Sequence, residues 1–193
     1  MSQVAELKHF EGKKVVSSIG MIVLLISFTM LFATLLLGYI VFRMTSEVWP
    51  PMGIQRISLV LPTISTIVIA LSSYTYFMFE KAYKSKDLKM AKLNFALTFL
   101  AGLGFMATQF TLWQSMKNQG LYVTGGIFPS MFYALTWVHA AHIVMAILAL
   151  ALMIPSLVKG YSESKELWTE NIGKFWHFLG IVWFVMYIIM FVF

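Results

Sequence analysis

Five long apolar stretches dominate this chain, and no charged side chain interrupts any of them away from its ends. They occupy about residues 19–42, 57–79, 93–116, 128–154 and 174–193. Each is long enough to cross a hydrocarbon core about 30 Å thick as an α-helix that rises about 1.5 Å per residue. Because lipid offers the backbone no hydrogen-bond partner, a segment that crosses it alone has to be helical. The sequence therefore predicts an all-α integral membrane protein with five transmembrane helices in one bundle.

The composition and the turn-forming residues agree with this organisation. The chain is 60% hydrophobic and 11% charged, whereas soluble domains have about a quarter of their residues charged. It contains no cysteine, which excludes disulfides and thiolate metal sites. We expect a polar N-terminal tail over residues 1–18 and a single transmembrane domain over 19–193. Pro50-Pro51-Met52-Gly53 interrupts the first connection, Gly125-Gly126 precedes the fourth stretch, and Pro155 ends it.

The distribution of basic residues predicts the orientation of the chain. Eleven of the 14 Lys and Arg residues lie in the tail, in the 80–92 connection or between residues 155 and 174. Arg43, Arg56 and Lys117 lie in the two opposite connections. Because cytoplasmic loops carry an excess of Lys and Arg, we expect the N-terminus inside and the C-terminus outside. The net charge of +6 then reflects topology and contact with anionic lipid, and we expect no nucleic-acid partner.

Three histidines lie within the apolar stretches. His139 and His142 are three residues apart and share roughly one helix face. His177 lies near the start of the last stretch, so it approaches His142 if the last two helices pack together. A haem held by two histidines needs ligands on opposite sides of the iron, which an i, i+3 pair alone does not supply. We therefore expect hydrogen bonds between helices, or contact with lipid phosphate, rather than ligation of a metal.

The remaining side chains favour packing over chemistry of the chain's own. An ion-coupled pump normally keeps charged groups inside its spans. The Ser, Thr and Gln residues of the second and third stretches suit hydrogen bonds between helices, and Trp113, Trp176 and Trp183 include candidates for membrane-interface anchors. The sequence contains no glycine-rich phosphate loop, Ser/His/Asp set or paired carboxylates. An independent b-type haem oxidoreductase and a small transporter stay open as alternatives.

The last two stretches carry a recognisable pattern. GGIFPSMFYALTWVHAAHIVMAI, followed after a connection by FWHFLGIVWFVMYIIMF, resembles the end of subunit III of the haem–copper oxidases, the cytochrome c and quinol oxidases. That family has two histidines three apart in its penultimate helix and a Trp-His-Phe triplet at the start of the last. The matching positions here are His139, His142, Trp176, His177 and Phe178.

Earlier segments extend the resemblance over residues 20–193. LLISFTMLFATLLLGYIVFR is similar to the family helix that ends in a Tyr and a nearby Arg, here Tyr39 and Arg43. GLGFMATQFTLW is similar to the segment with a Gln followed by a Trp, here Gln109 and Trp113. The chain resembles the short five-helix bacterial form, which lacks the first two helices of the seven-helix form.

Three positions depart from the family pattern. Phe28 and Leu112 stand where the family commonly has a glutamate, and Gly180 replaces an aspartate expected shortly after Trp-His-Phe. Any role of these three carboxylates is therefore not carried over to this chain.

The resemblance implies a non-catalytic accessory subunit of a respiratory terminal oxidase that reduces oxygen to water in the bacterial inner membrane. Such a subunit stabilises catalytic subunit I, supports proton uptake and binds phospholipid, while haem and copper reside in subunit I and in the copper-binding subunit II or its quinol-oxidase equivalent. An accessory protein of a nitric oxide reductase remains an alternative. The sequence does not distinguish cytochrome c from quinol as donor, or decide membership of a larger respiratory supercomplex.

By the same resemblance, no residue of this chain is expected to bind haem, copper or another metal, or to be catalytic. Seven residues are instead expected to contact lipid, neighbouring helices or partner subunits: Arg43, Gln109, Trp113, His139, His142, Trp176 and His177.

Overall fold

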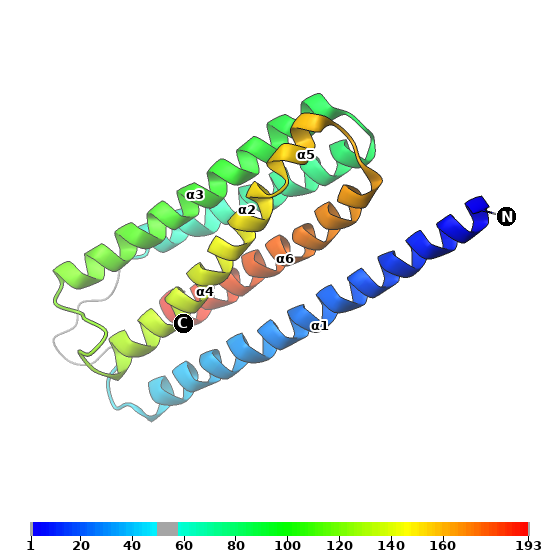
Figure 1. Cartoon of the computed structure of the whole chain (residues 1–193). Helices are drawn as coiled ribbons and strands as arrows, with labels where there is room; N and C mark the ends of the chain where they lie inside the picture. The colour runs from blue at the N-terminus through cyan, green and yellow to red at the C-terminus, as the bar shows by residue number, and fades with distance from the viewer. Residues whose placement is uncertain (1, 50–57, 193) are drawn as a thin grey trace.

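In a computed structural model the chain forms a bundle of long helices (Figure 1). The structure describes residues 2–49 and 58–192, and it describes the backbone alone for residues 2–11, 13, 163 and 164. Within these ranges there is no strand, and five segments are long and apolar enough to cross a membrane. The all-α prediction with five spans is therefore confirmed. The helices are α1 (Ser2–Thr45), α2 (Val60–Lys84), α3 (Leu88–Asn118), α4 (Ile127–Ala151), α5 (Ile154–Lys159), α6 (Glu163–Tyr187) and the π-helical turn η1 (Ile188–Val192).

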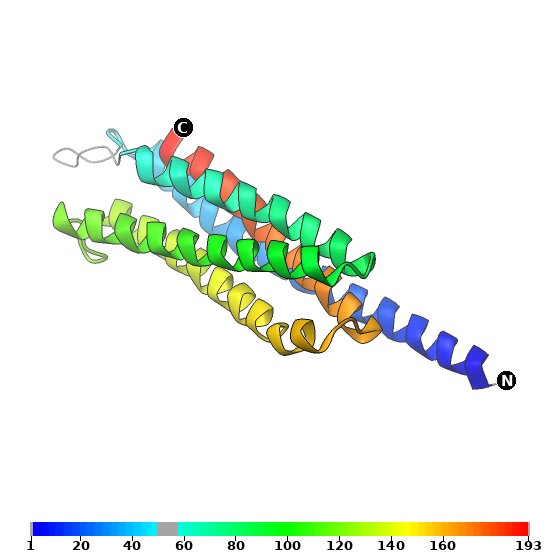
Figure 2. The same cartoon turned by 90° about the horizontal axis from the view of Figure 1, so that it is seen from above.

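The helices extend beyond the apolar stretches at several ends. Helix α1 begins at Ser2 and runs through the polar segment without a break, and its N-terminal end projects past the other helices (Figures 1 and 2). Helix α4 ends at Ala151, earlier than expected, and Pro155 lies in the first turn of the short α5. Proline is tolerated there because the backbone amides of a helix's first turn have no hydrogen-bond partner within the helix, so the missing N–H of proline costs no bond. The predicted break at residues 50–53, and Arg56, lie outside the described residues.

A three-residue turn joins α2 to α3. The Asp87 side chain caps α3 by accepting a hydrogen bond from the Met90 amide at 3.1 Å, which satisfies one of the free amides of the first turn. Lys86 adopts a positive φ of 61°, so the chain reverses within Ser85, Lys86 and Asp87. This short turn makes α2 and α3 antiparallel neighbours, which pack along their length (Figure 1).

One side of α2 bonds to α3 through side-chain hydroxyls. Ser65 and Thr108 are joined by a hydrogen bond of 2.7 Å, and Thr75 and Thr98 by one of 2.8 Å. Gln109 also donates to the Ser65 hydroxyl at 3.3 Å. In lipid these groups have no water to bond, so pairing between helices determines which faces meet.

Another side of α2 receives α6 through a repeat of small and large residues. Gly173, Trp176, Gly180 and Trp183 follow one another at spacings of three and four, which places them on one stripe of α6. The indole of Trp176 donates to the Ser72 hydroxyl of α2 at 2.8 Å, and that of Trp183 donates to the Thr66 hydroxyl at 3.1 Å. The two glycines lie against α2, where a Cβ on Gly173 would meet the Tyr76 ring at 2.8 Å. The repeat therefore sets the separation of α2 and α6.

The Trp176 ring also fits into a notch on α3. A Cβ added at Gly102 would meet Cη2 of Trp176 at 2.7 Å and the Ile147 side chain of α4 at 3.4 Å. Both Trp176 and Tyr76 are fully buried, and their rings are stacked with centroids 6.3 Å apart. Gly102 thus lets α3, α4 and α6 converge on one ring.

Replacement of Gly102 by alanine tests this convergence. We expect Gly102→Ala to destabilise the folded bundle by about 1–3 kcal/mol, because the added methyl overlaps an indole that cannot move away. Gly104→Ala on the same helix is the matched control, since nothing lies within 4 Å of its Cβ position. Reversible unfolding in mixed detergent measures both. Equal stability of the two variants would contradict the proposed notch.

Candidate functional site

The histidines and tryptophans of the sequence analysis meet in the interior of the bundle. His139 is the central residue of the 25-residue α4 and is fully buried. Three aromatic rings from three other helices surround its imidazole. The centroid distances are 5.9 Å to Phe32 of α1, 5.8 Å to Phe105 of α3 and 5.6 Å to Trp183 of α6. Neither ring nitrogen of His139 has a hydrogen-bond partner among the described residues.

Gln109 and Trp113 lie one turn apart on α3 and connect it to both neighbours. The Trp113 indole donates to the Thr136 hydroxyl of α4 at 3.0 Å, while the Gln109 amide bonds Ser65 of α2. Gln109 is 1% exposed, and its carbonyl oxygen Oε1 lacks a partner in the described part of the chain. Two residues singled out by sequence thus cross from α3 to different helices.

His142 lies on the side of α4 that faces α1. Its Nδ1 bonds the Val138 carbonyl oxygen of its own helix at 2.6 Å, so Nδ1 carries the proton in this arrangement. The ring packs edge-on against Phe28, with centroids 4.4 Å apart, and against Phe32 at 5.3 Å. Among the described residues, the contacts that His142 makes with other helices are therefore ring contacts rather than hydrogen bonds.

His177 lies elsewhere in the bundle. It is half-buried on α6, and its ring meets Tyr76 of α2 with centroids 5.8 Å apart. The structure therefore directs His142 toward α1 and His177 toward α2, and does not bring the two together. The reason is that Trp176, the neighbour of His177, occupies the side of α6 that faces the interior. Trp176 and Trp183 are fully buried, so the interpretation as membrane-interface anchors is wrong for these two.

Several contacts were not anticipated from the sequence. Lys84 bridges Glu80 of its own helix at 2.8 Å and Glu170 of α6 at 3.0 Å. The Tyr76 hydroxyl donates to the Thr169 carbonyl at 2.8 Å. The Lys174 ammonium donates to the Ser18 hydroxyl of α1 at 2.9 Å. The partners of these residues could not be predicted from the sequence, because the sequence does not specify how each helix is rotated about its axis.

Arg43 completes the residues singled out by sequence. It is half-buried in the last turn of α1, the end at which the Tyr39 hydroxyl accepts a bond from the Trp49 indole at 3.3 Å. Arg43 therefore lies at the opposite end of α1 from the Lys174 contact.

No metal centre is built around the three histidines by the side chains that the structure describes. Among those side chains, no group of three or more His, Cys, Asp or Glu could hold a metal ion. The rings of Phe32, Phe105 and Trp183 surround His139, and their carbon atoms are not metal ligands. The arrangement instead fits side chains that fix how five helices pack.

Apolar packing occupies the positions where the carboxylates of the resembled family are missing. Phe28 fills the space next to the His142 ring, and Leu112 is 1% exposed on α3. A Cβ at Gly180 would lie 3.2 Å from the Ser73 hydroxyl of α2, so a side chain there would require the Ser73 hydroxyl to shift by a few tenths of an ångström. Each of these three residues thus lies where its helix packs against the rest of the bundle.

A carboxylate restored at position 28 should be chemically detectable. Because no Asp or Glu lies between residues 12 and 46, we expect a hydrophobic carbodiimide to leave the first span unlabelled. Phe28→Glu should introduce labelling within residues 19–42, since the new carboxyl group lies at membrane depth beside His142. Phe28→Gln, which has the same shape but no acid, is the control. Peptide mass spectrometry reads the result, and labelling of the unchanged span would contradict it.

Comparison with known proteins gives a consistent result over nearly the whole chain. The family model described as Cytochrome c oxidase subunit III matches residues 6–193. Cytochrome c oxidase subunit 3 of Synechocystis sp. is 27% identical over 174 residues, which cover 89% of this chain and 73% of the relative. The protein of the same name from Thermostichus vulcanus is 26% identical over 90% of this chain and 86% of its own length. A probable cytochrome c oxidase subunit 3 of Nocardia farcinica is 27% identical over 94% of this chain and 90% of its own length. The described residues form five helices that are long and apolar enough to span a membrane, and the family model matches all but the first residues, so the chain belongs to the cytochrome c oxidase subunit III family.

Proposed function

We propose that this chain is the accessory subunit III of a respiratory haem–copper terminal oxidase, which reduces oxygen to water in aerobic electron transport. The observation that carries the proposal is the family match over residues 6–193. In this role the chain stabilises the catalytic subunit and supports its proton uptake, and it does not itself pass electrons. Its partners are catalytic subunit I and the copper-binding subunit II or the quinol-oxidase equivalent.

The packing of the bundle supports a stabilising role. Hydroxyl and indole bonds connect α2 to α3 and α6, while α1 has most of its large apolar side chains on the surface. Ile22, Met30, Leu37 and Val41 are each at least half exposed. Such a surface requires lipid or the apolar face of another membrane subunit. We infer that α1 contributes to contacts with phospholipid and with subunit I.

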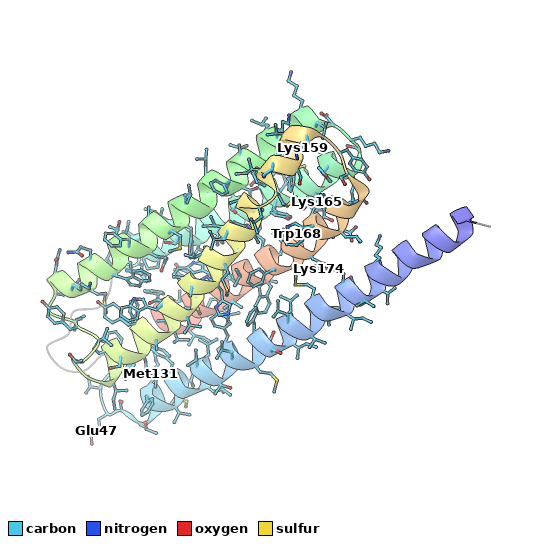
Figure 3. All side chains as sticks on the ribbon, in the orientation of Figure 1. Glu47, Met131, Lys159, Lys165, Trp168 and Lys174 are labelled. Carbon is cyan, nitrogen blue, oxygen red and sulfur yellow. The ribbon has the colours of Figure 1, made fainter. Side chains whose placement is uncertain are left out.

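The charges suit a chain held in the bacterial inner membrane with its N-terminus in the cytoplasm. Figure 3 shows Lys159, Lys165 and Lys174 toward one end of the bundle and Glu47 at the other. Lysine near the cytoplasmic surface is favoured by about 1 kcal/mol per residue when the lipid is anionic. The lysine-bearing end is therefore proposed to face the cytoplasm.

Purification from the native membrane tests the partners. We expect the tagged chain in mild detergent to retain a large multi-span oxidase subunit that carries haem, together with a copper-binding or quinol-oxidase partner, identified by mass spectrometry. Recovery of a nitric oxide reductase instead, or of the chain alone, would contradict the proposal.

Removal of the His142 ring tests the stabilising role. His142→Ala deletes contacts with Phe28 and Phe32, and loss of a buried ring typically costs about 3–5 kcal/mol. We expect the variant to dissociate from the complex at lower detergent concentration, while the haem absorbance per catalytic subunit stays unchanged. His142→Phe keeps a ring at this position and should behave more like the unchanged chain. Loss of a haem band specific to this chain would reject the role.

A further inference from the structure

The interior of the bundle contains two polar side chains, Gln109 and His139, with buried atoms that lack a hydrogen-bond partner among the described residues. Gln109 Oε1 and both ring nitrogens of His139 are buried without a partner among the described residues. An unpaired buried polar group typically costs about 1–3 kcal/mol. Nearly all such groups in folded proteins are paired with protein or with ordered water. Each of the two residues therefore calls for a hydrogen-bond partner that the described side chains do not supply.

Contacts on both sides of Gln109 place it at the level of His139. On α3, Phe105 lies one turn before Gln109 and Trp113 one turn after it, so all three share one face. Phe105 packs against His139, and Trp113 bonds Thr136. Because α3 and α4 are joined by a short connection and run antiparallel, these two contacts bracket Gln109. Gln109 therefore lies at the level of the α4 segment that carries Thr136 and His139.

The adjacent helices join the same level. Ser65 and Thr66 are neighbours on α2: Ser65 accepts the Gln109 amide, and Thr66 accepts the indole of Trp183. The Trp183 ring in turn packs on both Phe105 and His139. Side chains from α2, α3, α4 and α6 thus form one polar and aromatic layer across the bundle, and Phe32 of α1 closes it.

Within this layer the other polar groups are already paired. The Thr136 hydroxyl donates to the Phe132 carbonyl at 2.9 Å and accepts from Trp113. The Ser65 hydroxyl is bonded to the Leu61 carbonyl, to Thr108 and to Gln109. The groups with unused capacity are thus an amide oxygen on α3 and an imidazole on α4. Gln109 Oε1 only accepts, whereas a neutral imidazole has one donor and one acceptor nitrogen.

We propose that one water molecule is bound between Gln109 and His139 and connects α3 to α4 in the middle of the bundle. The water donates a hydrogen bond to Gln109 Oε1 and accepts one from the imidazole N–H. Buried waters usually have two to four such bonds. This assignment satisfies the imidazole donor, which is rarely left unpaired in folded proteins. The site belongs to the interior of the chain and does not depend on which partners the chain has.

The surroundings make this a structural water rather than part of a conducting path. Phe32, Phe105 and Trp183 enclose the imidazole with ring carbons, and no carboxylate lies in the apolar part of any span. A chain of waters would need further polar groups along the helices. The expected function of the site is to fix the rotation of α4 against α3.

A water-resolving cryo-electron microscopy map of the purified complex tests the site directly. We expect one density peak within hydrogen-bonding distance, about 2.7–3.2 Å, of both Gln109 Oε1 and one His139 ring nitrogen. A direct bond between the two side chains without a peak, or a peak that touches only one of them, would overturn the proposal. Because the map uses the unchanged chain, this test does not rely on the folding of any variant.

A double-mutant cycle gives a second test in solution. Gln109→Met and His139→Phe each remove one partner of the water and leave the other unpaired, whereas the double variant removes both. We expect the double variant to be destabilised less than the sum, with coupling of about threefold or more in the unfolding equilibrium constant. Gln109→Met combined with Thr98→Val is the matched control, because Thr98 pairs with Thr75, and it should be additive. Additivity in both pairs would overturn the shared water.

Discussion

The hydroxyl groups of α2 are the contacts on which the rest of this bundle depends. Ser65 and Thr75 bond to α3, whereas Thr66 and Ser72 receive the indoles of α6. In lipid, apolar faces have little preference for one another over the acyl chains, so packing and hydrogen bonds determine which helix faces meet. Helix α2 therefore serves as the reference against which α3 and α6 are oriented, and α4 is positioned through them.

The sequence was sufficient for the spans but not for their mutual rotation. Uninterrupted apolar length gave the five crossings, because a spanning segment has to satisfy its own backbone. The Ser and Thr residues were expected to bond between helices, yet their pairing, such as Ser65 with Thr108, depends on the rotation of two helices at once. For the same reason the sequence left open an approach of His142 to His177, whereas the structure directs them to α1 and α2.

For the candidate site, too, the sequence indicated which residues matter but not how they are arranged in space. The resemblance to the family selected Gln109, Trp113, His139, His142, Trp176 and His177, and the structure surrounds His139 with rings from three other helices. The contacts of Phe28 were not foreseen, because its ring is one of many in an apolar helix. At this position the chain has a ring packed edge-on against His142 in place of an ionisable group.

The fit of aromatic rings against glycines where α6 meets its neighbours has a consequence for the outer surface of the bundle. Trp176 against Gly102, and Gly173 against Tyr76, fix α6 in both height and rotation. Ile181 and Phe184, which lie on the outward side of α6 and are more than half exposed, are then held in one orientation. A protein or lipid that binds this side meets a preformed surface, and little of the binding free energy is lost in ordering it.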